Sequence, residues 1–200
     1  MQFIDSVEAL QALYGDPVPA ALTKVAREIT PAYRRWIEAS RFLVIATVGP
    51  EGVDASPRGD SEPVVRIEGA TTLLLPDWRG NNRIDTLRNI VRDPRVSLMF
   101  MVPGSDNVVR VIGAAQVTAD DGTTALFERD GRRPRTVLVV TAAELYFQCA
   151  KALMRSRLWS SPDESAGLPT AGQFLREATP GFDGESYDSG YPAQAREKMW

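Results

Sequence analysis

The stretch LLLPDWRGNNRIDTLRNIVRDPR, residues 73–95, decides how the rest of the chain is interpreted. Its apolar run Leu73–Leu75 predicts a strand that stops at Pro76, and a polar turn follows at residues 80–83. A helical pattern then continues to Asp93-Pro94. A strand, turn and helix in this order place amide donors and an arginine at a helix N-terminus, where an anion is held best. The stretch therefore predicts an anion-binding site.

The residues of the turn, GNNR (80–83), supply the chemistry of this site. Gly80 frees the backbone, Asn81 or Asn82 can cap the helix, and Arg83 offers a fork of donors to a phosphate. The alternative is an ordinary capped helix with a solvated arginine.

Composition narrows the possible functions. The 200 residues suffice for one domain, and a net charge of −3 argues against a nucleic-acid or membrane-surface role. Apolar stretches are far shorter than the ~20 residues of a membrane span, and no secretory signal is visible. The single cysteine, Cys149, excludes an internal disulfide framework, so we expect a cytoplasmic protein. Histidine is absent, so we expect no catalytic His and no metal, and redox chemistry would need an organic cofactor.

Apolar and alternating runs predict strands that are mostly joined by hairpins. They cover residues 42–48, 53–56, 64–67, 71–75, 96–102, 108–118, 136–140 and 144–148, the first of them buried on both faces. Pro57 places its strand at an edge, and Gly113 marks a bend or bulge. Because helices do not alternate regularly with the strands, a small antiparallel barrel is favoured over a parallel doubly wound sheet.

Helical patterns occur in residues 1–39, 84–93, 125–129 and 150–158. In the second of these we expect Ile84, Leu87 and Val91 to face the core. We divide the chain into an N-terminal helical segment packed on the barrel (1–39), a barrel (40–160) and a loosely structured, Gly- and Pro-rich tail (161–200) with at most a short helix near 173–177.

A second candidate cluster is Ser56, Pro57, Arg58 and Gly59. Arg58, beside a glycine at an irregular strand end, can reach a ribityl chain, a phosphate or the pyrimidine edge of a flavin. The alternative is a surface arginine that pairs with a neighbouring acidic residue.

The third cluster is FQCAKALMRSRLW, residues 147–159. On a helix Lys151, Arg155 and Trp159 share one stripe, which can complete a phosphate or flavin pocket. The alternative is a surface face whose cationic side chains cover apolar neighbours. Cys149 has no adjacent base, so we expect a buried, inert thiol.

Taken in order, these segments resemble the pyridoxamine 5′-phosphate oxidase-like FMN-binding split barrels. The segments are FLVIATV, VDASPRGD, residues 73–100 with their DPRVSL, VVRVIGAAQVT and FQCAKALMRSRLW. The resemblance covers roughly residues 40–160 and points to a bacterial branch of FMN-dependent enzymes. It implies a mainly β fold with flanking helices, a six-stranded antiparallel split barrel, and a homodimer with FMN at the interface.

The resemblance also implies a set of cofactor contacts. Residues 56–59 would lie along the isoalloxazine ring and ribityl chain, Asp77 would meet the flavin, and Asn82 and Arg83 would bind its phosphate. Phe147 and Gln148 correspond to an aromatic–Gln pair near the ring, supplied by the partner subunit. Lys151 and Arg155 would add cationic contacts.

The expected function is FMN-dependent hydride transfer to or from an unidentified small molecule, with a nicotinamide as a possible donor. The vitamin-B6 oxidases of the family use an Arg-x-His element for their substrate, so a chain without histidine is not expected to oxidise pyridoxine phosphate. The alternative is a non-catalytic flavin-, deazaflavin- or haem-binding protein on the same barrel, although the missing histidine disfavours haem.

Overall fold

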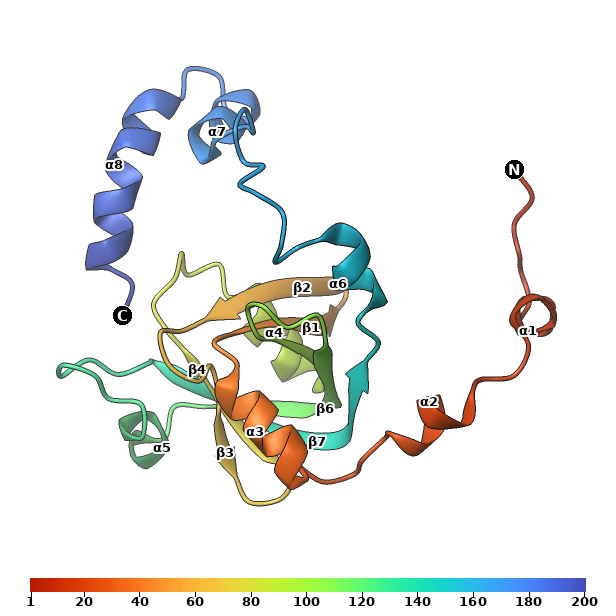
Figure 1. Ribbon diagram of the computed structural model, residues 1–200. Coiled ribbons are helices and arrows are strands. Elements are labelled where there is room, and N and C mark those ends of the chain that lie inside the picture. The colour runs from red at the N-terminus through yellow and green to blue at the C-terminus, as the bar shows by residue number, and fades with distance from the viewer.

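The computed structural model describes residues 1–200, and its centre is one seven-stranded sheet (Figure 1). Every neighbouring pair of strands is antiparallel, and the spatial order is β2-β1-β5-β6-β7-β4-β3. The strands are β1 (Phe42–Gly49), β2 (Gly52–Gly59), β3 (Arg66–Glu68), β4 (Thr72–Asp77), β5 (Arg95–Met101), β6 (Val108–Thr118) and β7 (Thr136–Gln148).

The mainly β, antiparallel architecture is confirmed, but the structure has seven strands where six were expected. The two runs predicted at residues 136–140 and 144–148 form one continuous strand, β7, and β3 is only three residues long. The sheet also curls. β2 and β4 are not neighbours in the strand order, yet Arg58 Nη2 lies 3.9 Å from Asp77 Oδ1. The two ends of the sheet therefore approach each other.

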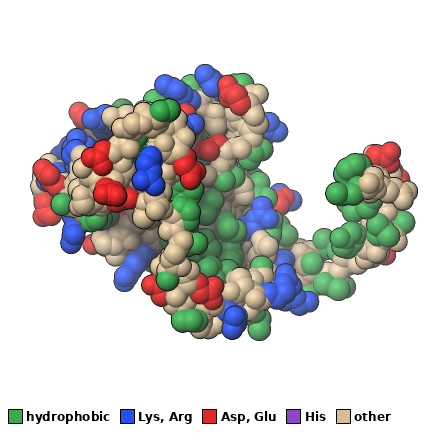
Figure 2. All heavy atoms as spheres, turned by 90° about the horizontal axis from the view of Figure 1, so that it is seen from above, with side chains coloured by type: hydrophobic (Ala, Val, Ile, Leu, Met, Phe, Trp, Pro, Cys, Tyr) green, Lys and Arg blue, Asp and Glu red, His purple; other side chains and the backbone are tan.

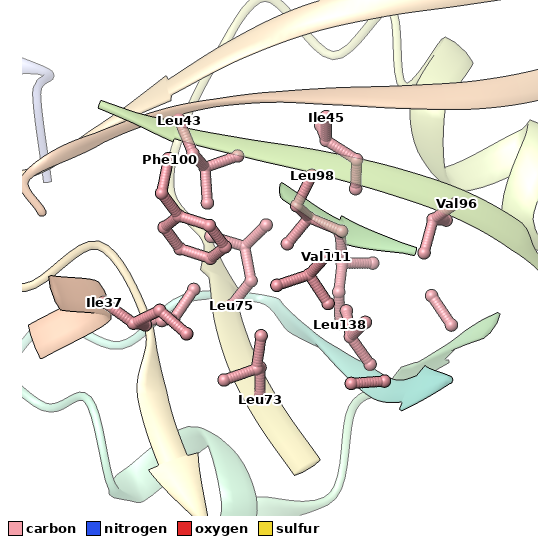
Figure 3. Close-up of a cluster of buried hydrophobic side chains, with 14 of the residues drawn as sticks. Ile37, Leu43, Ile45, Leu73, Leu75, Val96, Leu98, Phe100, Val111 and Leu138 are labelled. Carbon is pink, nitrogen blue, oxygen red and sulfur yellow. The ribbon is translucent and has the colours of Figure 1, made fainter. Parts of the chain in front are cut away.

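The apolar core lies inside this curl. Leu43, Ile45, Leu73, Leu98 and Phe100 are fully buried, and Figure 3 shows that they point toward one another from β1, β4 and β5. The prediction that residues 42–48 are buried on both faces is wrong: burial alternates along β1, because its second face is only half covered. Alternation of this kind is typical of antiparallel sheets.

Two strands of the sheet contain a proline. Pro57 lies in β2, an edge strand, as predicted. β4 continues through Pro76, where the sequence predicted its end. Proline is tolerated there because β3 pairs only with Thr72–Leu74, so Pro76 has a partner strand on one side only.

Gly113 marks a bulge, as predicted, because the register between β6 and β7 shifts between Ile112 and Gly113. At this point the two backbones come very close. A Cβ atom on Gly113 would lie 2.1 Å from the carbonyl oxygen of Thr141, which no side chain could tolerate. Only glycine fits here without a shift of β7.

The helices are α1 (Val7–Tyr14), α2 (Pro19–Thr23), α3 (Pro31–Ala39), α4 (Asp85–Arg92), α5 (Asp121–Ala125), α6 (Lys151–Ser156), α7 (Ala171–Ala178) and α8 (Gly184–Glu197). None of them combines the length and the apolar character needed to cross a membrane.

The N-terminal segment divides into two parts. α3 places Ile37 in the core, and Ala26 forms a bridge to Leu145 of β7. α1 and α2 bury no side chain, and they project from the body with apolar side chains on their surface (Figures 1 and 2). We expected all of residues 1–39 to pack on the barrel. Only the second part, with Ala26 and α3, does so.

The C-terminal segment is more ordered than its composition suggests. The tail expected at residues 161–200 contains α7 and the 14-residue helix α8. The two helices pack on each other, and Asp188 accepts a hydrogen bond from the Gly172 amide at 2.8 Å. A glycine- and proline-rich helix forms here because it has a partner helix, which local pattern does not reveal.

The predicted core face of α4 is confirmed for Leu87, which packs against the core, but it is wrong for Ile84 and Val91, which are exposed. Thr86, Asn89 and Ile90 are buried, whereas Val91 is 76% exposed. The Asn89 side chain donates to the Thr47 hydroxyl at 3.1 Å, and Thr86 Oγ1 lies 3.3 Å from Asp54 Oδ2. These hydrogen bonds allow polar residues to be buried, and they turn the helix away from its apolar stripe.

Candidate functional site

A cavity of about 1830 Å³ opens where the two ends of the sheet approach each other. Most of its lining comes from four segments: residues 54–61, 75–87, 132–136 and 197–200. Seven of the eleven predicted cofactor residues line it: Ser56, Pro57, Arg58, Gly59, Asp77, Asn82 and Arg83. The structure thus brings the first two predicted clusters into one site.

The wall contributed by β2 follows from the alternation of side chains along a strand. Asp54, Ser56 and Arg58 are half-buried, while Ala55 and Pro57 between them are exposed. Arg58 donates to the carbonyl oxygen of Pro57 at 2.9 Å and to the Ser56 hydroxyl. Its guanidinium is thereby held along β2, at the cavity.

Arg58 faces Asp77 across the cavity floor and does not pair with Asp60 or Glu62. Burial raises the pKa of the Asp77 carboxyl, and the nearby Arg58 charge opposes that shift only in part. The Arg58 Nε–H is buried and has no hydrogen-bond partner. An unsatisfied donor beside a hard-to-ionise acid is a strained arrangement, which a polar ligand in the cavity would relieve.

The raised pKa gives a pH-dependent prediction for Asp77→Asn. Below the unfolded-state value of 3.8 the carboxyl is neutral in both states, and folding carries no penalty. As the pH rises through the higher folded-state pKa, the folded protein must ionise a buried acid, and wild-type stability falls. We expect Asp77→Asn to raise the melting temperature at pH 7 and to have no effect below pH 3.8.

Asp163→Asn is the matched control for this measurement. A hydrogen bond from Ser165 lowers the pKa of the exposed Asp163 carboxyl, so its removal should lower stability at pH 7. Equal pH profiles for the two variants in thermal melts would contradict the assignment of the Asp77 shift to burial.

The turn before α4 differs from the predicted capped helix. Neither asparagine caps α4: Asn81 Oδ1 accepts from the Arg83 amide at 3.0 Å, and the N-cap is Ile84, which makes no side-chain cap bond. Asn82 and Ile84 both have left-handed backbones, with φ of 60° and 53°. Such a conformation is unusual for a β-branched residue and clusters at functional sites. The first amides of α4 therefore have no side-chain acceptor and can receive an anion.

Arg83 is paired with Asp85 and is largely exposed. Three other arginines line the cavity without an aspartate or glutamate partner: Arg79, Arg132 and Arg135. Arg135 Nη1 lies 3.5 Å from Asn82 Oδ1, which places it at the predicted phosphate turn. None of the three was predicted from the sequence, although the run GRRPR before β7 and the arginine two residues after Asp77 were visible signals.

The side chains that line the cavity carry an excess of positive charge, whereas the chain as a whole is negative. Six arginines and one lysine face the cavity against four aspartates and one glutamate, whereas the whole chain carries a net charge of −3. An excess of positive charge in a cleft attracts anionic ligands. The cavity therefore suits an anion, although the protein as a whole is acidic.

The third predicted cluster is not part of this cavity. Phe147, Gln148, Lys151 and Arg155 do not line it. Phe147 lies at the far end of β7 from Thr136, and at about 3.3 Å per residue an extended strand separates the two by up to roughly 35 Å. The Phe147 ring packs under Lys24, with Nζ 4.9 Å from its centroid. The expected burial of Cys149, in the same region, is wrong, because its thiol is exposed.

Comparison with known proteins gives one family. The family model described as pyridoxamine 5′-phosphate oxidase matches residues 29–149, more than half of the chain. No curated protein matches the chain significantly.

Three solved structures resemble this chain at low sequence identity. A variant of HupZ from Group A Streptococcus is 15% identical, with a TM-score of 0.51, covering 60% of this chain and 99% of its own. General Stress Protein 26 from Bacillus anthracis is 17% identical, with coverages of 57% and 88% and a TM-score of 0.43. An F420 reductase is 18% identical, with coverages of 60% and 98% and a TM-score of 0.45. At 15% identity the likeness to the HupZ variant concerns the fold alone.

Proposed function

The chain belongs to the pyridoxamine 5′-phosphate oxidase family, and from that membership we propose that it is an FMN-dependent oxidoreductase of the split-barrel type. Members of this family commonly bind flavins, and a cavity rich in arginine fits a flavin nucleotide. The substrate is a small molecule that the chain's residues do not identify.

The observation that carries this proposal is the set of cavity arginines without acidic partners. Arg79 and Arg135 have no carboxylate to neutralise them, and the first amides of α4 have no side-chain acceptor. A phosphate monoester accepts several charge-assisted hydrogen bonds and matches both kinds of donor. We therefore assign the phosphate of FMN to the turn at residues 80–84.

The remaining contacts follow from the same placement. When bound, the flavin supplies the hydride chemistry through its N5 atom, so no side chain of this protein needs to act in the redox step. Arg58, held along β2, can donate to the polar edge of the ring or to the ribityl chain. Leu75 and Val64, which line the floor, can cover the apolar part of the ring.

We further propose that the functional form is a homodimer with FMN at the interface. Phe147, Gln148, Lys151 and Arg155 would then complete the partner's cavity, since they lie too far from the cavity of their own chain. A dimer-dependent role predicts that charge removal at Lys151 weakens FMN binding although the residue is remote from the cavity in the monomer.

The direct test is to titrate the purified, flavin-free protein with FMN and to monitor the fluorescence during the titration. We expect stoichiometric quenching or a spectral shift, and reduction of the bound flavin by a nicotinamide donor under anaerobic conditions. Absence of any FMN binding would refute the proposal. Flavin that binds but accepts no electrons from any donor would favour the non-catalytic alternative, and mass spectrometry of extracted cofactor separates FMN from a deazaflavin.

The substitution Arg83→Ala tests the predicted anchor itself. We expect a roughly tenfold weaker affinity for FMN, about 1.4 kcal/mol, with the fold intact. The effect is moderate because Asp85 already engages Arg83 in the free protein and must release it. Unchanged affinity in the same titration would move the phosphate anchor to the unpaired arginines.

A further inference from the structure

Residues 197–200, the last residue of α8 and the three that follow it, form one wall of the candidate cavity. α8 and α7 pack on each other and stand apart from the sheet in Figure 1. At the end of α8 the chain returns to the cavity, where Arg132 Nη1 lies 3.4 Å from the main-chain oxygen of Glu197 and 3.3 Å from that of Trp200. This wall therefore belongs to a segment that is remote from the sheet over most of its length.

Trp200 docks on a cation–aromatic stack. The guanidinium carbon of Arg129 lies 4.8 Å from the centroid of the Trp200 ring and 5.4 Å from that of Trp78. The two indoles meet edge to face with their centroids 5.3 Å apart. The Arg129 cation attracts both rings and the two rings attract each other edge to face, so Trp200 has a specific docking position.

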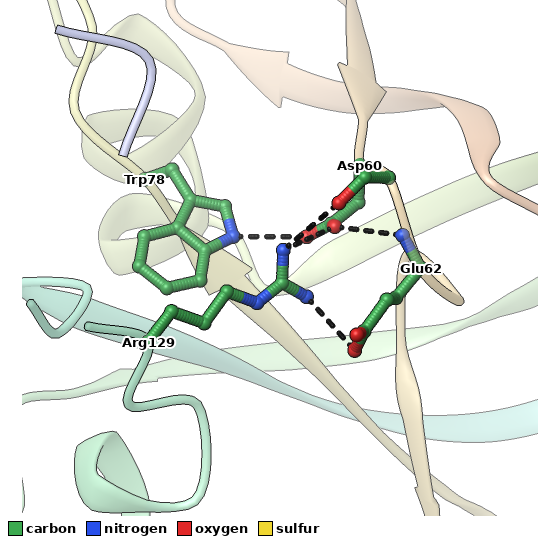
Figure 4. Close-up of polar contacts among 5 residues, drawn as sticks. Asp60, Glu62, Trp78 and Arg129 are labelled. Atoms are coloured by element: carbon green, nitrogen blue, oxygen red, sulfur yellow. Dashed lines mark hydrogen bonds and ion pairs between the residues drawn. The ribbon is translucent and has the colours of Figure 1, made fainter. Parts of the chain in front are cut away.

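The docking position is preformed by Asp60. Its side chain is only 2% exposed, and its two oxygens accept from Arg129 Nη1 at 2.6 Å and from Trp78 Nε1 at 3.1 Å. Figure 4 shows the carboxylate between these two groups, with Glu62 on the other side of the guanidinium. Because one buried acid holds both partners, Trp78 and Arg129 keep their orientation whether or not Trp200 is docked.

We propose that Trp200 is the access-controlling residue of the cavity: docked on Trp78 and Arg129, it closes one side and limits how far water and small molecules reach a bound flavin. This inference rests on the proposed function. A shielded flavin passes electrons to the substrate admitted to its cavity and not to small oxidants that diffuse in from solution. The docking contacts are few, so the wall can open to admit substrate.

The test is collisional quenching of bound FMN by acrylamide, with protein in excess so that all FMN is bound. We expect Trp200→Ala to raise the quenching constant about threefold and to change FMN affinity less than that. Trp200→Phe, which keeps an aromatic ring, should behave nearly as the wild type. Arg129→Lys, which keeps the charge opposite Asp60 but loses the planar stacking group, should lie between the two.

Tyr191→Ala is the control, because it removes an exposed aromatic ring from α8 that stacks on Tyr187 and does not line the cavity. FMN bound to this variant should be quenched by acrylamide to the same extent as FMN bound to the wild type. A quenching constant unchanged by Trp200→Ala would overturn the inference.

Hydrogen exchange of the flavin-free protein provides a second readout that does not depend on cofactor. Trp200→Ala should speed exchange of the amides at the end of α8, the segment that the docked Trp200 holds at the cavity. If the wild type binds no FMN, the proposed function fails, while this measurement still decides whether the wall is docked: unchanged exchange refutes it.

Discussion

Replacing both Arg79 and Arg135 with alanine is expected to weaken FMN binding by about 100-fold, about 2.7 kcal/mol. Neither guanidinium has a carboxylate partner, so neither must break an ion pair before it binds a phosphate. The loss should therefore exceed that of Arg83→Ala, whose arginine is shared with Asp85. Fluorescence titration with FMN measures it, and the effect should shrink at high salt because charges at the cavity mouth are screened.

The matched control removes the same charge elsewhere. Arg66 and Arg176 lie outside the cavity, on β3 and α7, and Arg66→Ala combined with Arg176→Ala changes the net charge equally. We expect little change in FMN affinity. Equal losses for the two double variants would indicate a general effect of net charge, and no loss for Arg79 and Arg135 would remove the phosphate from this turn.

Gly113→Ala is expected to destabilise the fold by about 3 kcal/mol, lowering the melting temperature by roughly 6–12 °C. The new Cβ would lie 2.1 Å from the Thr141 carbonyl oxygen, so β6 and β7 would have to separate at the bulge. These two strands carry the longest pairing in the sheet, and neither is free to move without its neighbours. Thermal or denaturant unfolding measures the change.

Gly190→Ala serves as the control for this substitution. Gly190 lies in α8, where an added Cβ meets no atom within 4 Å. Alanine is a better helix former than glycine by about 0.5–1 kcal/mol, so this variant should be as stable as the wild type or more stable. If Gly113→Ala were equally harmless, the bulge would have to tolerate a register change.

Local pattern predicted the strands well, because alternation and hairpin turns are encoded within a few residues. Gly113 and Pro57 gave the bulge and the edge strand for the same reason: each removes a backbone or side-chain feature that a regular central strand requires. The residues of the first two clusters were predicted from the sequence, but their meeting in one site was not. β2 and β4 are far apart in strand order, and it is the curl of the sheet that sets Arg58 against Asp77.

The failures have a common cause in contacts between distant segments. Asn89 is buried because it donates to Thr47 of β1, a partner that the helical pattern of α4 cannot reveal. α8 forms because α7 is beside it, despite Pro192 in its interior. Arg135 reaches the phosphate turn because β7 starts opposite Asp77 of β4, a register that sequence spacing does not give.

The two edges of the sheet have a consequence for how copies of this chain can associate. β2 carries Pro57, which has no amide hydrogen to donate to an added strand, and β3 at the other edge spans three residues. Both features discourage a further strand from pairing with a sheet edge. We therefore expect copies to meet through side-chain surfaces and not by extending the sheet, which leaves β2 and its arginine free to face a ligand.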